Sequence, residues 1–473
     1  MATVEETPFP RALSGALDGA LAPETREEEK YVSVVELVQQ PRMQVLIGAI
    51  LVYLAFGTEL AFENLVPYVL SYVRYNSPAE ENSGVGYEDA DWAWSSGYMV
   101  KSMLFLGGVL ELAAGPTTAL LIGGSVFCIG VGATYFSIST FTGFIMTYCV
   151  TCGLGQALAY VVPLTVVVRW FEGQSTGTAV GIIYAAYGLS SAIFSPIHSE
   201  IINPHGVASK RPPGWQEGDD ISERYFLDPK VLDRIPLLFP IMAVIYFSLI
   251  VCGTSLLKNP VTTARGGPQP DRVTAILTAV CTPHFWLLWL MFLANVRLLD
   301  FIQGYSKLFG MSLNIPDMYL ADAFAVAAIC TATGRLTFGM LADQVGFQRA
   351  MMGLVLAAGL LTGTWPLVSG WGQGFFLIWM WALHLVVAGN FSLMSFAVVK
   401  TFGAAQFGPL YGLIYTAQIP GTLLGAELAL TVATARGEWT LCYLSTGWSV
   451  VGLALISMWR EPFGKGEKTL DGP

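Results

Sequence analysis

Charged side chains inside long apolar segments are the residues of this sequence best suited to chemistry. Glu59 and Glu63 are four residues apart, and Lys101 lies in the next apolar segment. Arg297 and Asp300 are three residues apart in a later segment. Spacings of three or four place two side chains on one face of a helix. A charge at mid-membrane depth is costly unless it is paired or faces water, so each of the five is a candidate for function.

These five charges have two interpretations. In the first, Lys101 pairs with Glu59 or Glu63, and one of the two glutamates takes up a transported proton. Asp300 then belongs to the same proton-coupling group. In the second, Glu59–Lys101 and Arg297–Asp300 are closed ion pairs that fix helix packing and bind nothing. The sequence leaves both interpretations open.

The composition indicates that membrane helices carry these residues. The chain has 473 residues, of which 54% are hydrophobic and 12% are charged, with a mean hydropathy of +0.56. A soluble protein carries about twice that share of charge. The length accommodates about twelve helices of roughly 20 residues. We therefore expect an all-α membrane protein with helices at 44–73, 91–113, 118–137, 141–169, 175–201, 235–257, 283–306, 317–340, 348–369, 373–399, 407–433 and 438–459.

Polar segments divide these helices into two groups of six. The predicted units are a disordered cytoplasmic tail, a first bundle, a cytoplasmic linker, a second bundle and a second tail, at 1–41, 42–257, 258–282, 283–459 and 460–473. Lys and Arg are in excess in the short loops on the side of both termini, which predicts that both termini are cytoplasmic. No address signal chooses between the plasma membrane and an organelle membrane.

The two groups of helices repeat at an offset of 231 residues, the separation of Gly108 from Gly339 and of Gly181 from Gly412. One constant offset across separate stretches predicts two similar six-helix bundles, related by an axis normal to the membrane. A solute path between the bundles follows from this arrangement.

Residues 334–349, GRLTFGMLADQVGFQR, contain the pattern G-x-L-x-D-x-x-G. The glycines Gly339 and Gly346 let helix ends approach closely, Asp343 can cap a helix, and Arg349 is typical of a cytoplasmic loop. We interpret these four residues as a gating loop. The segment resembles the loop signature of the major facilitator superfamily, which joins the second and third helices of each six-helix half. The resemblance implies the twelve-helix, two-bundle fold of that family.

Residues 153–197 and 411–425 sharpen the resemblance, because they are similar to the oxalate/formate and monocarboxylate branch of the family. This implies transport of a small organic anion, with a proton or in exchange for a counter-anion. Arg335 matches the intramembrane arginine of the eighth helix, so it is the first choice for a carboxylate anchor. In the alternative interpretation, Arg335 snorkels to the cytoplasm or pairs with Asp343, since it lies about four residues from the predicted helix end.

Two positions depart from the pattern of that branch. Thr331 stands where monocarboxylate carriers have an aspartate, and Gln418 stands where oxalate-type carriers have a lysine. A site with one cation suits a monoanion better than a dianion. Gln418 can offer its amide to a substrate oxygen, and the other candidates for substrate contact are Arg297, Tyr184, Tyr187 and Tyr415.

Four aromatic or histidine side chains have less specific assignments. His384, in the middle of the tenth helix, is a candidate for proton relay or for hydrogen-bonded packing. His198, near the end of the fifth helix, is expected at the membrane interface. Trp92 and Trp94 open the second helix and are expected to be interface anchors.

The favoured function is secondary transport of a small monocarboxylate of the pyruvate, lactate or formate type by alternating access. One alternative is a carrier for an amino acid or other zwitterion, with Glu59 and Glu63 holding the amine. Another is a membrane sensor that does not transport. The sequence has no phosphate loop, nucleophile elbow or zinc-type spacing, which predicts no ATP-driven pump, no enzyme, no cofactor and no metal. The expected partners are the anion and the bilayer, not nucleic acid, and a monomer suffices.

Overall fold

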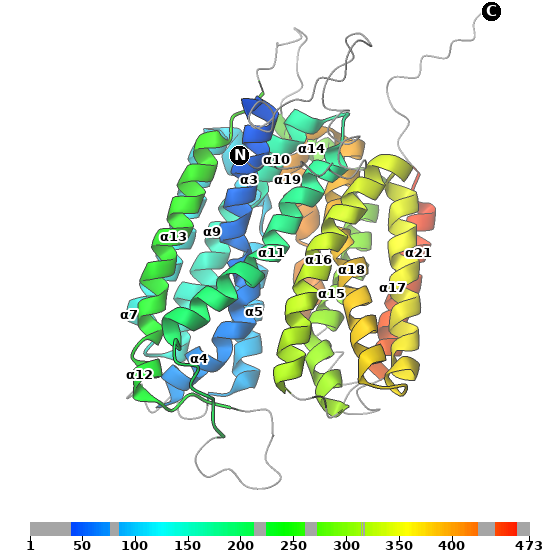
Figure 1. Cartoon of the computed structure of the whole chain (residues 1–473). Helices are drawn as coiled ribbons and strands as arrows, with labels where there is room; N and C mark the ends of the chain where they lie inside the picture. Colours follow the sequence, from blue (N-terminus) through cyan, green and yellow to red (C-terminus); the bar gives the residue numbers. More distant parts are fainter. Residues whose placement is uncertain are drawn as a thin grey trace, which may run out of the picture.

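The computed structural model describes residues 39–75, 85–211, 224–260, 272–313, 315, 317–423 and 440–460. Within these ranges, ten helices are long and apolar enough to cross a membrane, and a bent pair makes eleven. The eleventh predicted span, 407–433, begins with a helix, and its residues 424–433 lie outside the described part of the chain. Figure 1 shows these helices as two groups packed side by side. The predicted all-α membrane fold is confirmed.

The first bundle is built from residues 41–256. Its elements are α3 (Pro41–Phe56), η1 (Gly57–Ala61), α4 (Phe62–Tyr75), α5 (Tyr87–Lys101), α6 (Phe105–Ala114), α7 (Pro116–Ser137), α8 (Phe141–Phe144), the π-helical η3 (Ile145–Thr151), α9 (Cys152–Ala159), α10 (Val161–Phe171), α11 (Thr176–Ile202), α12 (Pro229–Leu232) and α13 (Ile235–Leu256).

The second bundle follows the predicted linker, whose last part is a helix rather than a loop. Its elements are α14 (Arg272–Val280), α15 (Pro283–Ser312), α16 (Asp317–Val345), α17 (Phe347–Ser369), α18 (Gln373–Phe402), η4 (Ala404–Gln406), α19 (Phe407–Tyr415) and α21 (Thr440–Met458). The helices α14 and α15 meet at an angle of 68°. We call the end of the molecule where α3 begins and α21 ends the terminal face, and the other end the opposite face (Figure 1).

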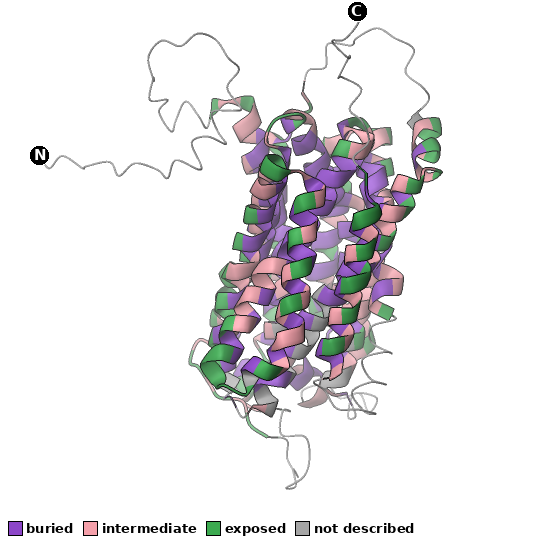
Figure 2. Cartoon of the chain, turned by 90° about the vertical axis from the view of Figure 1, so that its right-hand side faces the viewer, coloured by how far each residue is buried: buried purple, intermediate pink, exposed green. Residues whose placement is uncertain are grey.

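The outer surface of the bundles is apolar, as a lipid-facing surface must be. Phe136 is 82% exposed, and Leu360 and Met458 are also exposed on their helices. Buried residues face the interior of the molecule, while exposed and intermediate residues follow the outer sides of the helices (Figure 2). In lipid, helices of this kind satisfy their own backbone hydrogen bonds, so they need only apolar side chains outside.

The first and second membrane helices are broken, where the sequence predicted continuous helices at 44–73 and 91–113. The first changes to a 3₁₀ turn at η1, and the second stops at Lys101 and resumes at Phe105. A Cβ atom on Gly57 would lie 2.4 Å from the carbonyl oxygen of Tyr187, so only glycine allows this approach to α11. Periodicity did not reveal the breaks, because the apolar pattern runs through them.

Contacts between the two bundles occur in equivalent pairs, whose residues are related by the 231-residue offset. Gly177 of α11 meets Gly339 of α16, and the equivalent Gly408 of α19 meets Gly108 of α6. A second set follows the same relation: Gly181 against Leu336, and Gly412 against Phe105. These contacts lie in the half of the molecule nearest the terminal face, because α11 and α19 begin there and α6 and α16 end there. The internal repeat is therefore a real pseudo-symmetry of packing.

Candidate functional site

A cavity of about 330 Å³, which we call the central cavity, lies between the two bundles. Its walls are mainly aromatic, with one basic side chain from each bundle. The lining residues are Leu60, Trp94, Tyr98, Lys101, Tyr160 and Tyr187 from the first bundle, and Arg335, Phe391 and Tyr415 from the second. Such a cavity combines apolar walls with a few convergent polar groups, which is the usual composition of a small-molecule site.

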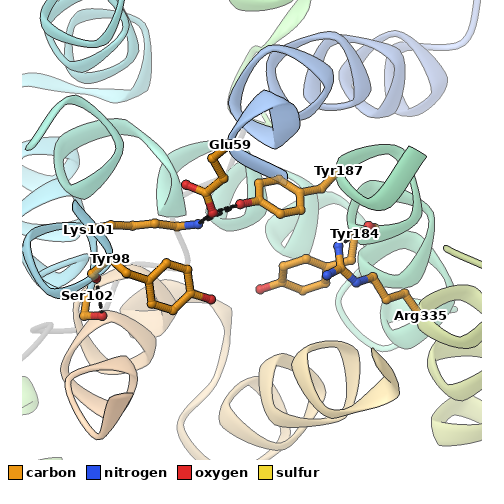
Figure 3. Close-up of polar contacts among 7 residues, drawn as sticks. All are labelled: Glu59, Tyr98, Lys101, Ser102, Tyr184, Tyr187 and Arg335. Carbon is orange, nitrogen blue, oxygen red and sulfur yellow. Dashed lines mark hydrogen bonds and ion pairs between the residues drawn. The ribbon is translucent and has the colours of Figure 1, made fainter. Parts of the chain in front are cut away.

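Lys101 forms a buried ion pair with Glu59 at one side of this cavity (Figure 3). Its Nζ atom also donates a hydrogen bond of 2.7 Å to the hydroxyl of Tyr187, which in turn donates to the same Glu59 oxygen. Lys101 is the last residue of α5, where the helix dipole favours a cation. The side chain of Lys101 is 2% exposed and that of Glu59 is 16% exposed. The predicted pairing of Lys101 with Glu59 is therefore present.

Arg335 approaches the central cavity from the second bundle (Figure 3). Its Nη1 donates to the carbonyl oxygen of Tyr184 at 3.0 Å, and its guanidinium lies 5.3 Å from the ring of Tyr187 and 5.6 Å from that of Phe391. Its Nε is buried and has no hydrogen-bond acceptor. Among the described side chains, Arg335 has no carboxylate partner. Arg335 thus lines the central cavity with a donor that has no protein acceptor.

The predicted depth of Arg335 was wrong. The helix α16 continues to Val345, so Arg335 lies ten residues from its end and not four. At the rise of an α-helix this is about 15 Å. Arg335 is 3% exposed, and Asp343, its proposed alternative partner, binds the start of α11 instead. Snorkelling to the terminal face is therefore not what the structure shows.

A second cavity, of about 460 Å³, lies inside the first bundle, and we call it the side cavity. It shares Trp94 and Tyr98 with the central cavity. Its other lining residues are Thr58, Glu59, Phe62, Gly97, Phe127, Val131, Tyr148, Cys149, Cys152, Gly153 and Gln156. Glu59 lines the side cavity and its partner Lys101 lines the central one, so this ion pair stands between the two spaces.

The other predicted site residues occupy varied places. Tyr415 lines the central cavity, while the hydroxyl of Tyr184 lies 2.7 Å from that of Tyr411. Gln418 is fully buried, with neither amide atom hydrogen-bonded, and lines neither cavity. Arg297, on α15, is 9% exposed and lines neither cavity.

Of the three other predicted proton-coupling residues, the structure describes the side chain of His384 alone. The Nδ1 atom of His384 lies 2.8 Å from the carbonyl oxygen of Met380, and His384 lines neither cavity. Glu63 lies on α4 and Asp300 on α15, and their side chains are outside the part of the chain that the structure describes.

The predicted gating loop is shorter than the sequence suggested, because Gly339 and Asp343 belong to α16 and Arg349 to α17, and only Gly346 lies between the two helices at the terminal face. Gly346 has φ = +84°, which favours glycine, and Arg349 is exposed. The Asp343 carboxylate accepts hydrogen bonds from the amide of Gly177 at 2.8 Å and from the amide of Thr178 at 2.7 Å. It therefore caps α11 of the other bundle, and the cap is an interaction between bundles.

Sequence reasoning missed several aromatic residues of the site. Tyr98 and Tyr160 line the central cavity, with the Lys101 Nζ 5.1 Å and 4.8 Å from their ring centroids. The spacing of Tyr98 and Lys101, three residues on one helix, was a usable signal. Trp94, expected at the interface, lines both cavities instead. His198, also expected there, is 1% exposed.

Two pseudo-symmetric helical bundles around a cavity with buried charges define a membrane carrier. Residues 45–426 match the family model of the Major Facilitator Superfamily, and the chain belongs to this family. The family and the relatives below identify a transporter rather than an enzyme.

Two curated relatives cover most of the chain. The Apicoplast pyruvate carrier 1 of Toxoplasma gondii is 26% identical, over 87% of this chain and 88% of its own length. The Oxalate:formate antiporter of Oxalobacter formigenes is 21% identical, over 85% of this chain and 89% of its own length. The chain is thus similar to carriers whose names specify small carboxylates.

Two solved structures share the fold. The human organic anion transporter MFSD10 has a TM-score of 0.66 at 14% identity, over 88% of this chain and all 100% of that chain. The E. coli fucose:proton symporter FucP has a TM-score of 0.61 at 13% identity, over 88% of this chain and 97% of that chain. At these identities the likeness concerns the fold alone.

Proposed function

We propose that this protein carries a small monocarboxylate such as pyruvate, lactate or formate across a membrane. One observation carries the proposal: Lys101 and Arg335 line one cavity, and Glu59 offsets only one of their two charges. The described side chains therefore leave one net positive charge for a substrate, which suits a monoanion. The names of the pyruvate carrier and the oxalate:formate antiporter support this substrate class.

Arg335 is the proposed anchor for the substrate carboxylate. A guanidinium binds a carboxylate with two parallel hydrogen bonds, and that geometry also selects a planar anion. Arg335 has few protein acceptors, since only its bond to the Tyr184 carbonyl is seen, so a carboxylate can take its other donors. The rings of Phe391 and Tyr415 offer an apolar wall for the rest of a small substrate.

Glu59 is the proposed carrier of the coupled proton. Protonation of Glu59 would weaken its ion pair with Lys101 and free that ammonium group for the substrate carboxylate. In the empty state, the three groups Glu59, Lys101 and Arg335 together carry a net charge of +1. With a proton and a monoanion bound they carry the same net charge, so neither state has an extra charge to desolvate as the bundles move. Exchange of two anions would use the same site without release of the proton.

Alternating access would come from rocking of the two bundles about the central cavity. The contacts of α11 with α16 and of α6 with α19 hold the bundles together near the terminal face. The charge bias of the loops supports a cytoplasmic terminal face. In that orientation the contacts close the cytoplasmic side in the conformation observed.

The test is uptake of labelled pyruvate into liposomes that hold the purified protein, with and without an inward proton gradient. Loss of a buried charged hydrogen-bond partner costs about 2–5 kcal/mol, so Arg335→Gln should lower uptake about 30-fold or more. The exposed Arg460→Gln serves as control. Absence of pyruvate uptake by the folded wild-type protein would contradict the proposal, and amino acids would then be screened with Glu59→Gln.

A further inference from the structure

A chain of hydrogen bonds leads from the neighbourhood of Glu59 through the interior of the first bundle. Thr58, next to Glu59 in η1, shares a hydrogen bond with the hydroxyl of Tyr246 in α13. The Nε2 atom of His198 in α11 lies 3.1 Å from the same hydroxyl. All three residues are buried, at 2%, 2% and 1% exposure. Three different membrane helices therefore contribute to one buried polar chain.

His198 is the member of this chain nearest to the opposite face. It lies four residues before the end of α11 at Ile202, which is about 6 Å along the helix axis. Its Nδ1 is buried and has no hydrogen-bond partner. An imidazole can receive a proton on one nitrogen and release one from the other. The hydroxyls of Tyr246 and Thr58 are each donor and acceptor, so they can pass a proton on.

The side cavity connects this chain to Glu59. Thr58 and Glu59 both line the cavity, and so does Gln156, whose buried Oε1 has no hydrogen-bond donor. The side cavity has three polar groups on its wall and room for water, which would bridge the Thr58 hydroxyl to the Glu59 carboxylate. The substrate cations Lys101 and Arg335 line the other cavity. Glu59 is thus accessible from a side that the substrate does not use.

We propose that His198, Tyr246 and Thr58 form a proton path that reaches Glu59 from the opposite face through the side cavity. The inference rests on the proposed function, in which Glu59 carries the coupled proton. Each hydroxyl gives one proton and receives one, the imidazole is reprotonated from the aqueous phase, and Glu59 gains the proton. Proton and substrate then reach the Glu59–Lys101 pair by separate routes.

Other titratable groups surround this path and must be considered in a pH experiment. Glu59 contacts Lys101 of α5 and Tyr187 of α11. It also interacts electrostatically with Tyr148, Cys152 and Tyr160. Apart from His198, the titratable groups that face Tyr246 are Tyr148, Cys128 and Cys152. Since Tyr148 faces both Glu59 and Tyr246, a pH profile alone cannot assign the path, and substitutions along the path are needed.

The test compares two assays on the full-length protein in liposomes with an internal pH indicator. The first follows pyruvate uptake and internal acidification under an inward proton gradient. The second follows exchange of external labelled pyruvate for internal pyruvate at equal pH, where the proton can stay on Glu59. In His198→Gln and Tyr246→Phe, we expect gradient-driven uptake to fall on the order of tenfold or more, with exchange within about twofold of wild type.

His384→Gln is the matched control, because it removes another membrane histidine that lines neither cavity. Both assays should be unchanged in this variant. A wild-type protein that takes up pyruvate without gradient stimulation would contradict proton coupling and, with it, the path. A stimulated wild type with equally stimulated His198→Gln and Tyr246→Phe variants would overturn the path. So would an equal loss of uptake and exchange in folded Tyr246→Phe, since the network would then be structural.

Discussion

Glu59 and Lys101 illustrate how one buried ion pair can serve both structure and transport. The pair is held by Tyr187, which bonds to both partners, and by the end of α5 behind the lysine. A closed pair of this kind costs much to desolvate and stabilises little by itself. In the mechanism we propose, the pair matters because protonation of the carboxylate weakens it. The two interpretations drawn from the sequence are therefore successive states of one site in the mechanism we propose.

At the residue scale, Glu59→Gln should remove the pH dependence of pyruvate uptake. Protonation of the Glu59 carboxylate is favoured as the pH falls, so wild-type uptake should rise as the external pH is lowered. The glutamine imitates the protonated form at every pH, and exchange should continue. Uptake measured across an external pH series would reveal a flat profile.

The control for this experiment is Glu200→Gln, an exposed acidic residue near the end of α11. Its uptake should keep the wild-type pH profile. A preserved pH response in Glu59→Gln would move the proton to another carboxylate, and Glu63→Gln would be measured next. A preserved response in both variants would end the proposal that this helix carries the proton.

At the element scale, the helices of each bundle pack at distances that only glycine allows. A Cβ atom on Gly334 of α16 would lie 1.8 Å from the carbonyl oxygen of Leu385 in α18. Gly334 also stands one residue before the proposed anchor Arg335, so this contact positions the anchor. Close approach through small residues is the usual means of helix association in a membrane, where apolar burial gives no driving force.

Gly334→Ala should therefore destabilise the second bundle. The methyl group meets backbone atoms that cannot rotate away, and overpacking of this kind costs about 1–3 kcal/mol. The measurement is the midpoint of thermal unfolding in detergent. Gly353→Ala on α17 is the matched control, because a Cβ atom there meets no atom within 4 Å. An unchanged midpoint in Gly334→Ala would show that α16 and α18 can separate at little cost.

At the scale of the whole molecule, the pseudo-symmetry is broken at the terminal face. Asp343 caps α11 across the bundle interface. By the 231-residue offset, Leu112 stands where Asp343 stands, and Pro409 stands where Thr178 stands. Leucine cannot accept a hydrogen bond and proline has no amide hydrogen to donate. One of the two equivalent contacts between bundles is therefore electrostatic, while the other is packing alone.

Asp343→Ala should shift the protein toward a conformation in which the terminal face is open. A lost helix cap costs about 0.5–2 kcal/mol, and this loss would lower the stability of the closed conformation alone. The measurement places spin labels at the exposed positions Ala114 and Gln344 in a cysteine-free background. The shift would appear as a population with a longer distance between the two labels. Leu112→Ala is the control at the equivalent position. Identical distance distributions in wild type and Asp343→Ala would contradict the role of the cap.

Many features were predictable from the sequence because they depend on local pattern. The apolar segments located the helices, and the glycine spacing indicated the 231-residue repeat. Charges inside apolar segments marked Glu59 and Lys101, and the family resemblance marked Arg335. The breaks at Gly57 and after Lys101 were not predictable, because hydropathy continues through them. The end of α16 was also misplaced, since Asp343 was interpreted as part of a loop and is still helical.

The sequence by itself determined the class of fold, the pseudo-symmetry and the rare charges that a membrane protein must account for. Only the tertiary structure decided which of these charges meet. Glu59 pairs with Lys101 rather than remaining free, and Arg335 faces the same cavity from the other bundle. It also decided that His198 and Tyr246 belong to one buried chain. The physical reason is that helical periodicity fixes neighbours within a turn, while contacts between helices depend on how whole bundles pack.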